Sequence, residues 1–481
     1  MQNTEQKRFY ITTTLPYVNG RPHIGYALEM VEADVIARMA RLRDYEVVFN
    51  TGTDEHGAKI YEKAGECGKT PQAYCDEMSE HFRALQSVLG VSFTHFIRTT
   101  DTHHKSAARE FWKRCEASGD IYKKSYPVKY CVGCELEKTD SDLVDGRCPD
   151  HPNRELEIRE EENYFFRFSK YQEPLLALYH ARPDFVVPAK RMNEITAFVE
   201  RGLQDFSISR LAEKMPWGIA VPGDAEHTMY VWFDALVNYV STLGWPENEE
   251  HFRIFWPGTQ IAGKDNLRQQ AAMWQAMLFS AGLPPSRQIL IHGHITSAGQ
   301  KMSKSLGNVI SPEELVERFG VDGTRYILLA TSAFGEDMDL TMERMTEKYN
   351  ADLANGLGNL VSRVMKLAEH LDVSVLRQSI SEHDQHIGIS EEVSISMDRY
   401  QFSEALQSIW QKISDANKYM DETKPWILVK NDQTRFAVVM QRLLRDIESV
   451  ALDLQPFLPD TSEKILQALA TGKITPLFQR I

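Results

Sequence analysis

The first fifty residues alternate between apolar and turn-forming segments in the order of a βαβ unit. The apolar, β-branched segment Phe9–Val18 ends at Asn19-Gly20, as expected of a strand followed by a turn. From His23 onward apolar residues recur every three or four positions, which predicts a helix. Residues 45–49 form a short apolar run typical of a buried strand. Strand, turn, helix and strand in this order predict a parallel sheet.

The pattern changes twice further along the chain. Residues 120–225 are rich in charge, Tyr, Phe and Pro, and we interpret them as an insertion. Short apolar runs at 229–233, 252–256 and 288–291 indicate that the α/β pattern resumes, with buried strands. After about residue 345 strand signals fade, and an apolar stripe from Leu353 to Leu371 predicts a bundle of helices.

Composition narrows the class of protein. Hydrophobic residues make up 42% of the 481 residues and charged ones 25%, which is typical of a folded soluble protein. No apolar run approaches the roughly 18 residues of a membrane span, and the N-terminus lacks the pattern of a secretory signal. We therefore expect a cytoplasmic protein with no membrane partner. The net charge of −14 argues against a basic nucleic-acid-binding domain.

Two short motifs carry phosphate-binding chemistry. His23-Ile24-Gly25-Tyr26 lies where the first strand gives way to the helix, and helix N-termini attract anions. Gly25 lacks the side chain that would keep a nucleotide at a distance. The second motif, Lys301-Met302-Ser303-Lys304-Ser305, follows a turn at Ser297-Ala298-Gly299. Its lysines and hydroxyls offer a triphosphate both charge and hydrogen bonds.

A cluster of thiols and one imidazole lies within the predicted insertion. Cys-x2-Cys is followed after 13 residues by Cys-x2-His, through Cys131, Cys134, Cys148 and His151. This is the ligand spacing of a tetrahedral zinc ion. Four protein ligands leave no open position, so we expect one structural Zn²⁺ rather than a catalytic one. A redox Cys-x-x-Cys pair and a coincidental cluster are the alternatives.

With these motifs the chain resembles the class I aminoacyl-tRNA synthetases, whose signatures are His-Ile-Gly-His and Lys-Met-Ser-Lys-Ser. The second signature matches fully, and the first departs at Tyr26, where that family usually has His. Residues from about 8 to about 465 resemble methionyl-tRNA synthetases in particular. The stretches that carry this resemblance are 14–19, 51–57, 230–235 and 263–265.

The resemblance implies a methionine site and an ATP site. The residues expected around the methionine side chain are Leu15, Tyr17, Trp232, Ala235, Tyr239, Gln270 and Trp274, and Asp54 is expected to bind the ammonium group. Gln270 stands where the family usually has a His near the sulfur. The residues expected at ATP are His23, Gly25, Tyr26, Asp265, Lys301, Ser303 and Lys304. Of these, His23, Tyr26, Lys301 and Lys304 are expected to be catalytic, with Mg²⁺ accompanying ATP.

The implied reaction is the two-step attachment of L-methionine to tRNA through methionyl-adenylate. The resemblance also implies that Asn359, Arg363 and Trp426 read the anticodon, and that the zinc cluster forms a knuckle in the insertion. We expect a monomer.

The expected fold is an α/β, class I Rossmann-type nucleotide-binding fold with a zinc-containing connective insertion, followed by an all-α helical bundle. The expected domains are a catalytic first half (1–119), the connective insertion (120–225), a catalytic second half (226–290), a stem-contact linker (291–345) and an anticodon-binding domain (346–481). The linker carries the segment Lys301–Ser305, which we call the lysine loop.

Three other functions are compatible with the residues. The first is a synthetase for another amino acid, which Tyr26 and Gln270 favour. The second is a different nucleotidylyltransferase that forms a small-molecule adenylate without tRNA. The third is a non-catalytic RNA-binding paralogue, which the intact lysine loop opposes. Synthetases for Val, Ile and Leu carry a large editing insertion, and the segment 120–225 is too short for one.

Overall fold

A parallel β-sheet forms the centre of the catalytic half. The computed structural model describes residues 6–131, 136–138, 143, 145–149, 153, 155–297, 299–301, 310–371 and 388–481. The strand order of the sheet is β3-β2-β1-β12-β13-β7, and all neighbouring strands in it run parallel. Its strands are β1 (Arg8–Thr12), β2 (Glu46–Thr53), β3 (His95–Arg98), β7 (Val186–Val187), β12 (Thr259–Gly263) and β13 (Gln288–His292). The predicted parallel sheet is confirmed.

The order of the strands reverses direction between β1 and β12. From β1 the chain proceeds outward through β2 to β3, and after the insertion it returns to β12 on the other side of β1. In open α/β sheets ligands bind in the crevice outside the carboxyl ends of the strands at such a switch point. The helix α1 (Ile24–Leu42) begins beside this crevice, with His23 as its N-cap residue.

Helices pack on both faces of the sheet, because the β1 neighbours Ile11 and Tyr10 belong to two separate buried cores that both contain helical residues. Besides α1, the helices of the first half of the chain are α2 (Ala58–Glu66), α3 (Pro71–Arg83), α4 (Leu85–Val88) and α5 (Thr102–Ala117). In the second half they are α8 (Val231–Leu236), α9 (Asn238–Ser241), α10 (Glu249–Phe255) and α11 (Trp274–Ser280), with the short turns η3 (Lys264–Asn266) and η4 (Gln269–Met273).

Two runs expected to be strands are helical. Residues 231–233 belong to α8 and residues 252–255 to α10, whereas the strand that pairs with β1 is β12. A short apolar run does not by itself distinguish a buried helix from a buried strand. Here Phe233, Phe252 and Phe255 are buried, whereas Trp232 is 41% exposed.

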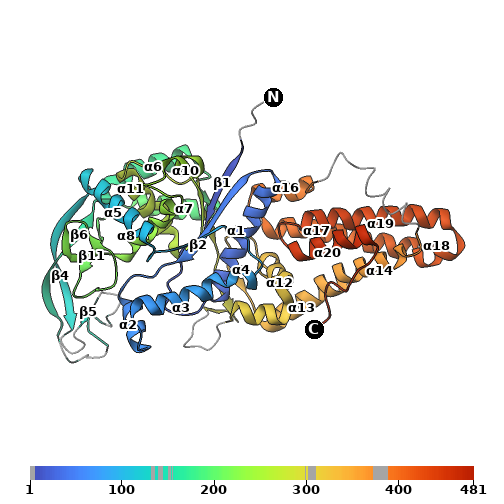
Figure 1. The fold of residues 1–481 in the computed structure, drawn as a ribbon, viewed down its shortest axis with the longest axis horizontal. Coiled ribbons are helices and arrows are strands. Elements are labelled where there is room, and N and C mark those ends of the chain that lie inside the picture. The colour runs from blue at the N-terminus through green and yellow to red at the C-terminus, as the bar shows by residue number, and fades with distance from the viewer. Residues whose placement is uncertain are drawn as a thin grey trace.

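The segment between residues 120 and 225 forms antiparallel sheets at one end of the molecule (Figure 1). The larger sheet contains β4 (Ile121–Cys131), β5 (Leu136–Lys138), β6 (Glu157–Phe166) and β8 (Phe206–Ser207), and the smaller contains β9 (Ser209–Leu211), β10 (Ala220–Val221) and β11 (Asp224–Met229). Between them lie η2 (Phe168–Tyr171), α6 (Gln172–Ala181) and α7 (Ala189–Glu200). Strand β7 of this segment joins the central sheet beside β13, so the segment is partly built into the catalytic core.

The opposite end of the molecule is a helical bundle, as predicted (Figure 1). A small sheet of β14 (Ile295–Ser297), β15 (Gln300–Lys301) and β16 (Met338–Asp339) precedes it. The helices at this end of the molecule are α12 (Pro312–Ala330), α13 (Met342–Lys348), η6 (Tyr349–Gly358), α14 (Asn359–Ala368), α16 (Glu391–Asp398), α17 (Phe402–Thr423), α18 (Pro425–Asn431), α19 (Gln433–Leu454) and α20 (Pro459–Thr471). No helix in the described ranges has both the length and the apolar composition to cross a membrane.

A buried ion pair joins the catalytic half to the bundle. Asp34 on α1 and Arg325 on α12 are both 0% exposed, and Arg325 Nη1 lies 2.8 Å from Asp34 Oδ2. Arg325 also donates hydrogen bonds to the carbonyls of Phe457 (2.7 Å), Pro456 (3.1 Å) and Leu89 (3.3 Å). The guanidinium therefore ties together the first helix of the nucleotide fold, the loop after α4 and the turn before α20.

Replacing Arg325 is expected to destabilise both parts of the protein. Arg325→Met removes a buried cation and leaves carbonyl acceptors without donors, which costs about 3–5 kcal/mol. The midpoint of urea unfolding, followed by circular dichroism, is expected to fall. The matched control is Arg344→Met, because Arg344 is 64% exposed and pairs only with Asp339 among the described residues. An exposed pair contributes about 1 kcal/mol or less, so equal shifts in the two variants would contradict the prediction.

Candidate active site

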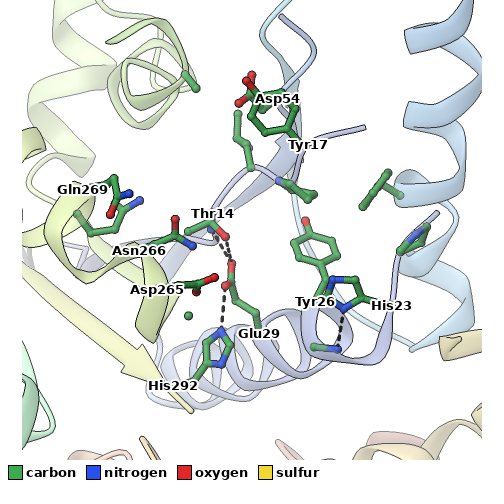
Figure 2. Close-up of a pocket in the computed structure, with 18 of the residues that line it drawn as sticks. Thr14, Tyr17, His23, Tyr26, Glu29, Asp54, Asp265, Asn266, Gln269 and His292 are labelled. Atoms are coloured by element: carbon green, nitrogen blue, oxygen red, sulfur yellow. Dashed lines mark hydrogen bonds and ion pairs between the residues drawn. The ribbon is translucent and has the colours of Figure 1, made fainter. Parts of the chain in front are cut away.

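A cavity of about 520 Å³ opens at the carboxyl ends of β1 and β12, at the switch point of the sheet (Figure 2). Eleven of the residues expected at methionine or ATP line it: Leu15, Tyr17, His23, Gly25, Tyr26, Asp54, Trp232, Ala235, Tyr239, Asp265 and Gln270. They come from four separate stretches of the sequence. The fold therefore brings both predicted sites into one space.

His23 and Gly25 form the start of α1 on the cavity wall. His23 is extended (φ −126°), and its Nδ1 accepts a hydrogen bond from the Gly25 N–H at 3.1 Å. A Cβ atom on Gly25 would lie 3.1 Å from the His23 ring, so the glycine makes room for the imidazole. Since Nδ1 accepts, the neutral ring carries its proton on Nε2.

Tyr26 is buried one turn along the same helix. Its hydroxyl is hydrogen-bonded to Thr51 Oγ1 at 2.6 Å, and its ring packs edge-on against Phe82 at 5.6 Å. Burial raises the pKa of Tyr26 above its usual value, although the hydrogen bond with Thr51 opposes this effect. Tyr26 is therefore an uncharged wall residue with a fixed hydroxyl.

Asp54 presents an unpaired carboxylate oxygen to the cavity. The residue follows β2, is 3% exposed and pairs through its backbone with Tyr17. Its Oδ1 has no hydrogen-bond partner in the described part of the chain. Burial and the nearby charge of Asp234 raise the pKa of Asp54 well above its usual range. A cationic donor in the cavity would satisfy this oxygen and favour its ionised form.

A buried carboxylate between two imidazoles supports the wall that α8 provides. Asp234 Oδ2 lies 2.6 Å from His56 Nδ1, and its Oδ1 lies 2.8 Å from His104 Nε2. Burial alone would raise the pKa of Asp234, but the two imidazoles lower it to about 2. The helix that carries Trp232 and Ala235 is thus fixed to α5 and to the loop after β2. Our sequence analysis missed this cluster.

Tyr239 and Gln270 form the opposite wall. Gln270 Nε2 donates to Tyr239 Oη at 2.8 Å, and both residues are buried. Trp274, expected in the methionine site, does not line the cavity. It is 0% exposed and packs edge-on against Tyr239 at 5.7 Å, behind the wall. Trp274 therefore supports the tyrosine ring.

A second polar cluster that the sequence analysis missed joins the two halves of the sheet. Glu29 Oε1 accepts hydrogen bonds from the backbone N–H (2.7 Å) and the hydroxyl (2.6 Å) of Thr14, and its Oε2 lies 3.0 Å from His292 Nε2 (Figure 2). Burial alone would lower the pKa of His292, but the hydrogen bond with Glu29 and the charge of Glu32 raise it to about 9. The sequence offered one signal for this cluster: Glu29 and Glu32 are acidic residues within the helix predicted from His23 onward, and both are buried.

Asp265, His294 and Ile295 of β14 complete the lining of the cavity. Asp265 Oδ1 lies 3.4 Å from His294 Nε2. The β14–β15 hairpin is fixed by Asp339, whose Oδ1 accepts from the Gly299 N–H at 2.8 Å. Lys301 ends β15, whereas Ser303 and Lys304 lie outside the described residues.

The described cysteines of the predicted zinc cluster, Cys131 and Cys148, are buried. Cys131, at the end of β4, is 1% exposed, and Cys148 is 0% exposed although Asp145, Gly146, Arg147 and Pro149 around it are exposed. Cys134 and His151 lie outside the described residues. The described side chains alone contain no metal-binding cluster.

The residues expected at the anticodon lie on the helical bundle. Asn359 and Arg363 are one turn apart on α14, and the Arg363 guanidinium lies 5.4 Å from the centre of the Trp426 ring. Arg363 also pairs with Asp421 at 3.0 Å. Trp426 is 39% exposed, so its indole is open to a stacking partner rather than buried in the core.

Two protein-family models together match nearly the whole chain. A family model described as "tRNA synthetases class I (M)" matches residues 9–155 and 150–365. A second model, described as "Anticodon binding domain of methionyl tRNA ligase", matches residues 359–476.

Individual relatives agree with these models. The methionine–tRNA ligase of Caldanaerobacter subterraneus subsp. tengcongensis is 42% identical over 475 residues, covering 96% of this chain and 74% of the relative. That of Thermosynechococcus vestitus is 43% identical over 494 residues, covering 97% and 92%. The methionyl-tRNA synthetase of Mycobacterium tuberculosis in complex with methionyl-adenylate has a TM-score of 0.86 at 39% identity and covers 98% of this chain and 97% of that structure. By both sequence and fold, the chain belongs to the methionyl-tRNA synthetase family of class I aminoacyl-tRNA synthetases.

Proposed function

We propose that the protein attaches methionine to tRNA in two steps through methionyl-adenylate. The methionine carboxylate attacks the α-phosphorus of ATP and pyrophosphate leaves. A ribose hydroxyl at the tRNA 3′ end then takes the methionyl group, and AMP leaves. Membership of the family supports this reaction, because relatives named methionine–tRNA ligase cover nearly the whole chain.

The single observation that carries the proposal is the unpaired Asp54 oxygen in a cavity with aromatic walls. A buried carboxylate is stable in its ionised form only beside a donor or a cation, and the ammonium of an amino acid supplies both through charge-assisted hydrogen bonds. Leu15, Tyr17, Trp232 and Ala235 line the same cavity. Apolar and aromatic surfaces favour a polarizable thioether.

The start of α1 and the lysine loop bind ATP in this proposal. The helix N-terminus at His23 offers positive electrostatic potential, and His23 Nε2 donates to a phosphate. Asp265 binds the ribose hydroxyls. Lys301 and Lys304 neutralise the pyrophosphate as it leaves, Ser303 offers ATP a hydrogen bond from its hydroxyl, and Mg²⁺ enters with ATP. Tyr26 shapes the wall through its bond with Thr51 and contributes no charge.

Catalysis in this reaction rests on positioning and electrostatic stabilisation. The nucleophile is the carboxylate of the substrate, so no side chain of the protein forms a covalent bond. Asp54 holds the ammonium end of the amino acid, and the phosphate site lies in the same cavity. Holding two reactants in one orientation removes most of the entropy loss of their encounter.

A structural zinc ion in the insertion is part of the proposal. Burial of these thiols fits metal ligation, because Cys148 is buried within a run of exposed residues that offers little apolar surface to bury a thiol otherwise. Cys131, Cys134, Cys148 and His151 would hold the ion. With four protein ligands it would stabilise the local fold and take no part in the reaction.

The bundle is proposed to bind the anticodon, through stacking on Trp426 and hydrogen bonds from Asn359 and Arg363. Splayed, stacked bases are the usual mode of recognising RNA loops. The domain boundaries, the monomeric state and the cytoplasmic location expected from the sequence remain parts of this proposal.

The substrate is tested by ATP–pyrophosphate exchange with each of the twenty amino acids. Methionine is expected to support the fastest exchange, and a faster rate with another amino acid would contradict the proposal. Asp54→Asn removes the charge that pairs with the ammonium, a bond to a charged group worth about 1.5–3 kcal/mol. The KM for methionine is therefore expected to rise about 10- to 100-fold. Asp44→Asn, outside the cavity, is the control.

The lysine loop is tested by Lys304→Ala. Loss of one oriented donor at the pyrophosphate is expected to slow adenylate formation by about 10²–10³. Single-turnover formation of the adenylate measures this step directly. An exposed lysine far from the cavity, Lys473, supplies the control Lys473→Ala, and a wild-type rate in Lys304→Ala would remove Lys304 from the mechanism.

The anticodon site is tested by Trp426→Ala. Loss of one stacked base is expected to weaken tRNA binding by about 1–3 kcal/mol, raising the KM for tRNA in aminoacylation. Pyrophosphate exchange without tRNA is expected to stay at the wild-type rate. Ile395→Ala removes another exposed apolar side chain and serves as the control. Equal loss of exchange and aminoacylation would assign Trp426 a structural role.

A further inference from the structure

Glu55, the residue that follows Asp54, is a buried carboxylate outside the lining of the cavity. Its Oε1 accepts hydrogen bonds from Thr53 Oγ1 at 2.6 Å and from Arg98 Nε at 2.7 Å. Its Oε2 accepts from Thr100 Oγ1 at 2.5 Å and from Arg98 Nη2 at 2.9 Å. Each carboxylate oxygen thus accepts two hydrogen bonds, which together fix the position of the side chain.

Arg98 reaches Glu55 from the end of the neighbouring strand. Arg98 is the register partner of Thr53 across the parallel strands β3 and β2, so it lies beside the residues that follow β2. Its two bonds to the carboxylate have the fork geometry in which a guanidinium binds a carboxylate most strongly. Its Nη2 also donates to Asp76 Oδ1 on α3 at 2.7 Å. With a side chain that is 17% exposed, Arg98 links the loop after β2 to both β3 and α3.

The backbone of Glu55 is fixed as well. Its N–H donates to Thr99 Oγ1 at 2.9 Å, and its carbonyl accepts from the Trp217 indole N–H at 2.5 Å. Asp54 donates its backbone N–H to the Pro16 carbonyl at 3.0 Å, whereas its Oδ1 has no partner in the part of the chain that the structure describes. The position of the Asp54 carboxylate therefore depends largely on bonds made by the residue beside it.

The charge of Arg98 matters in addition to its geometry. Burial, the charge of Asp234 and the charge of Glu55 all raise the pKa of Asp54. Arg98 offsets the last of these charges, because it is paired with Glu55 through two hydrogen bonds. Without the guanidinium, an unpaired carboxylate would lie next to the carboxylate that must be ionised to bind an ammonium group.

We propose that Arg98 is a positioning residue which, through Glu55, holds the Asp54 carboxylate in place for the ammonium group of the amino-acid substrate. The inference rests on the proposed function, in which Asp54 binds that ammonium group. Arg98 does not line the cavity and touches neither methionine nor ATP. Its influence is confined to the amino-acid end of the site, because His23 and the lysine loop bind the phosphates.

The test is ATP–pyrophosphate exchange in which the KM for L-methionine and the KM for ATP are measured separately. In Arg98→Met the KM for methionine is expected to rise about 5- to 20-fold, because the bond between Asp54 and the ammonium group is weakened but not removed. The KM for ATP is expected to stay within about twofold of the wild-type value. A merely structural role would raise both constants together.

Two further variants separate the effect of charge from that of packing. Arg98→Lys keeps the cation but loses the forked pair of bonds, and its KM for methionine is expected to rise only about two- to fivefold. Adding Glu55→Gln to Arg98→Met removes the unpaired charge beside Asp54. The KM for methionine is then expected to fall by about two- to fivefold relative to Arg98→Met alone. A further rise in this double variant would contradict an action through Glu55.

The matched control is Arg191→Met on α7. The Arg191 side chain is 12% exposed and pairs with Glu194 at 2.7 Å, so the substitution removes a similarly buried cation that does not line the cavity. It is expected to leave both KM values unchanged. In an Asp54→Asn background, Arg98→Met is expected to change the KM for methionine by less than about twofold, because the two residues act as one unit.

The outcomes separate this inference from the proposed function. Failure of methionine to support exchange in the wild type would overturn the proposed function. Normal exchange in the wild type with a wild-type KM for methionine in Arg98→Met would overturn the positioning role alone. An equal rise in the KM for ATP, or a full effect of Arg98→Met in the Asp54→Asn background, would do the same. If thermal unfolding shows that Arg98→Met does not fold, Arg98→Lys decides, and an unchanged KM for methionine in that variant overturns the positioning role.

Discussion

The buried pair of Asp34 and Arg325 is the constraint on which the arrangement of the two halves depends. A guanidinium with no contact to water must find its acceptors within the protein, and Arg325 finds them on Asp34 and on the carbonyls of Leu89, Pro456 and Phe457, which belong to two further segments. The same α1 that carries Asp34 begins at His23 beside the cavity. One helix therefore links the bundle to the cavity.

The cavity combines charged groups and neutral groups in different places. Asp54 and the pair of Glu29 and His292 lie where the carboxyl ends of the strands meet, and each is buried. The wall beside Tyr239, in contrast, is held by Gln270, which does not ionise near neutral pH. Charge is thus placed where a substrate carries charge, and neutral hydrogen bonds are placed where the proposed substrate is apolar.

The sequence predicted the parallel sheet, the helix at His23 and the helical bundle, because each has a clear apolar period or a motif at its end. It did not distinguish the short helices α8 and α10 from strands, and it missed β12. A strand or helix that is buried on all sides lacks the alternation of apolar and polar residues by which it could be recognised. Trp274 was expected in the methionine site, but it does not line the cavity and packs against Tyr239 from behind the cavity wall. A sequence motif that contains aromatic residues does not show which of them faces the cavity and which supports its wall from behind.

What the sequence determined by itself is the chemistry of the candidate site: the His23 helix start, Asp54 after a strand and the aromatic residues that line one cavity. Only the tertiary structure decided which buried groups support them. Asp234 between two imidazoles, and Arg98 beside Glu55, join residues far apart in the chain. Hydrogen-bond direction depends on the partners that folding brings within about 3 Å, and sequence spacing carries no record of those partners.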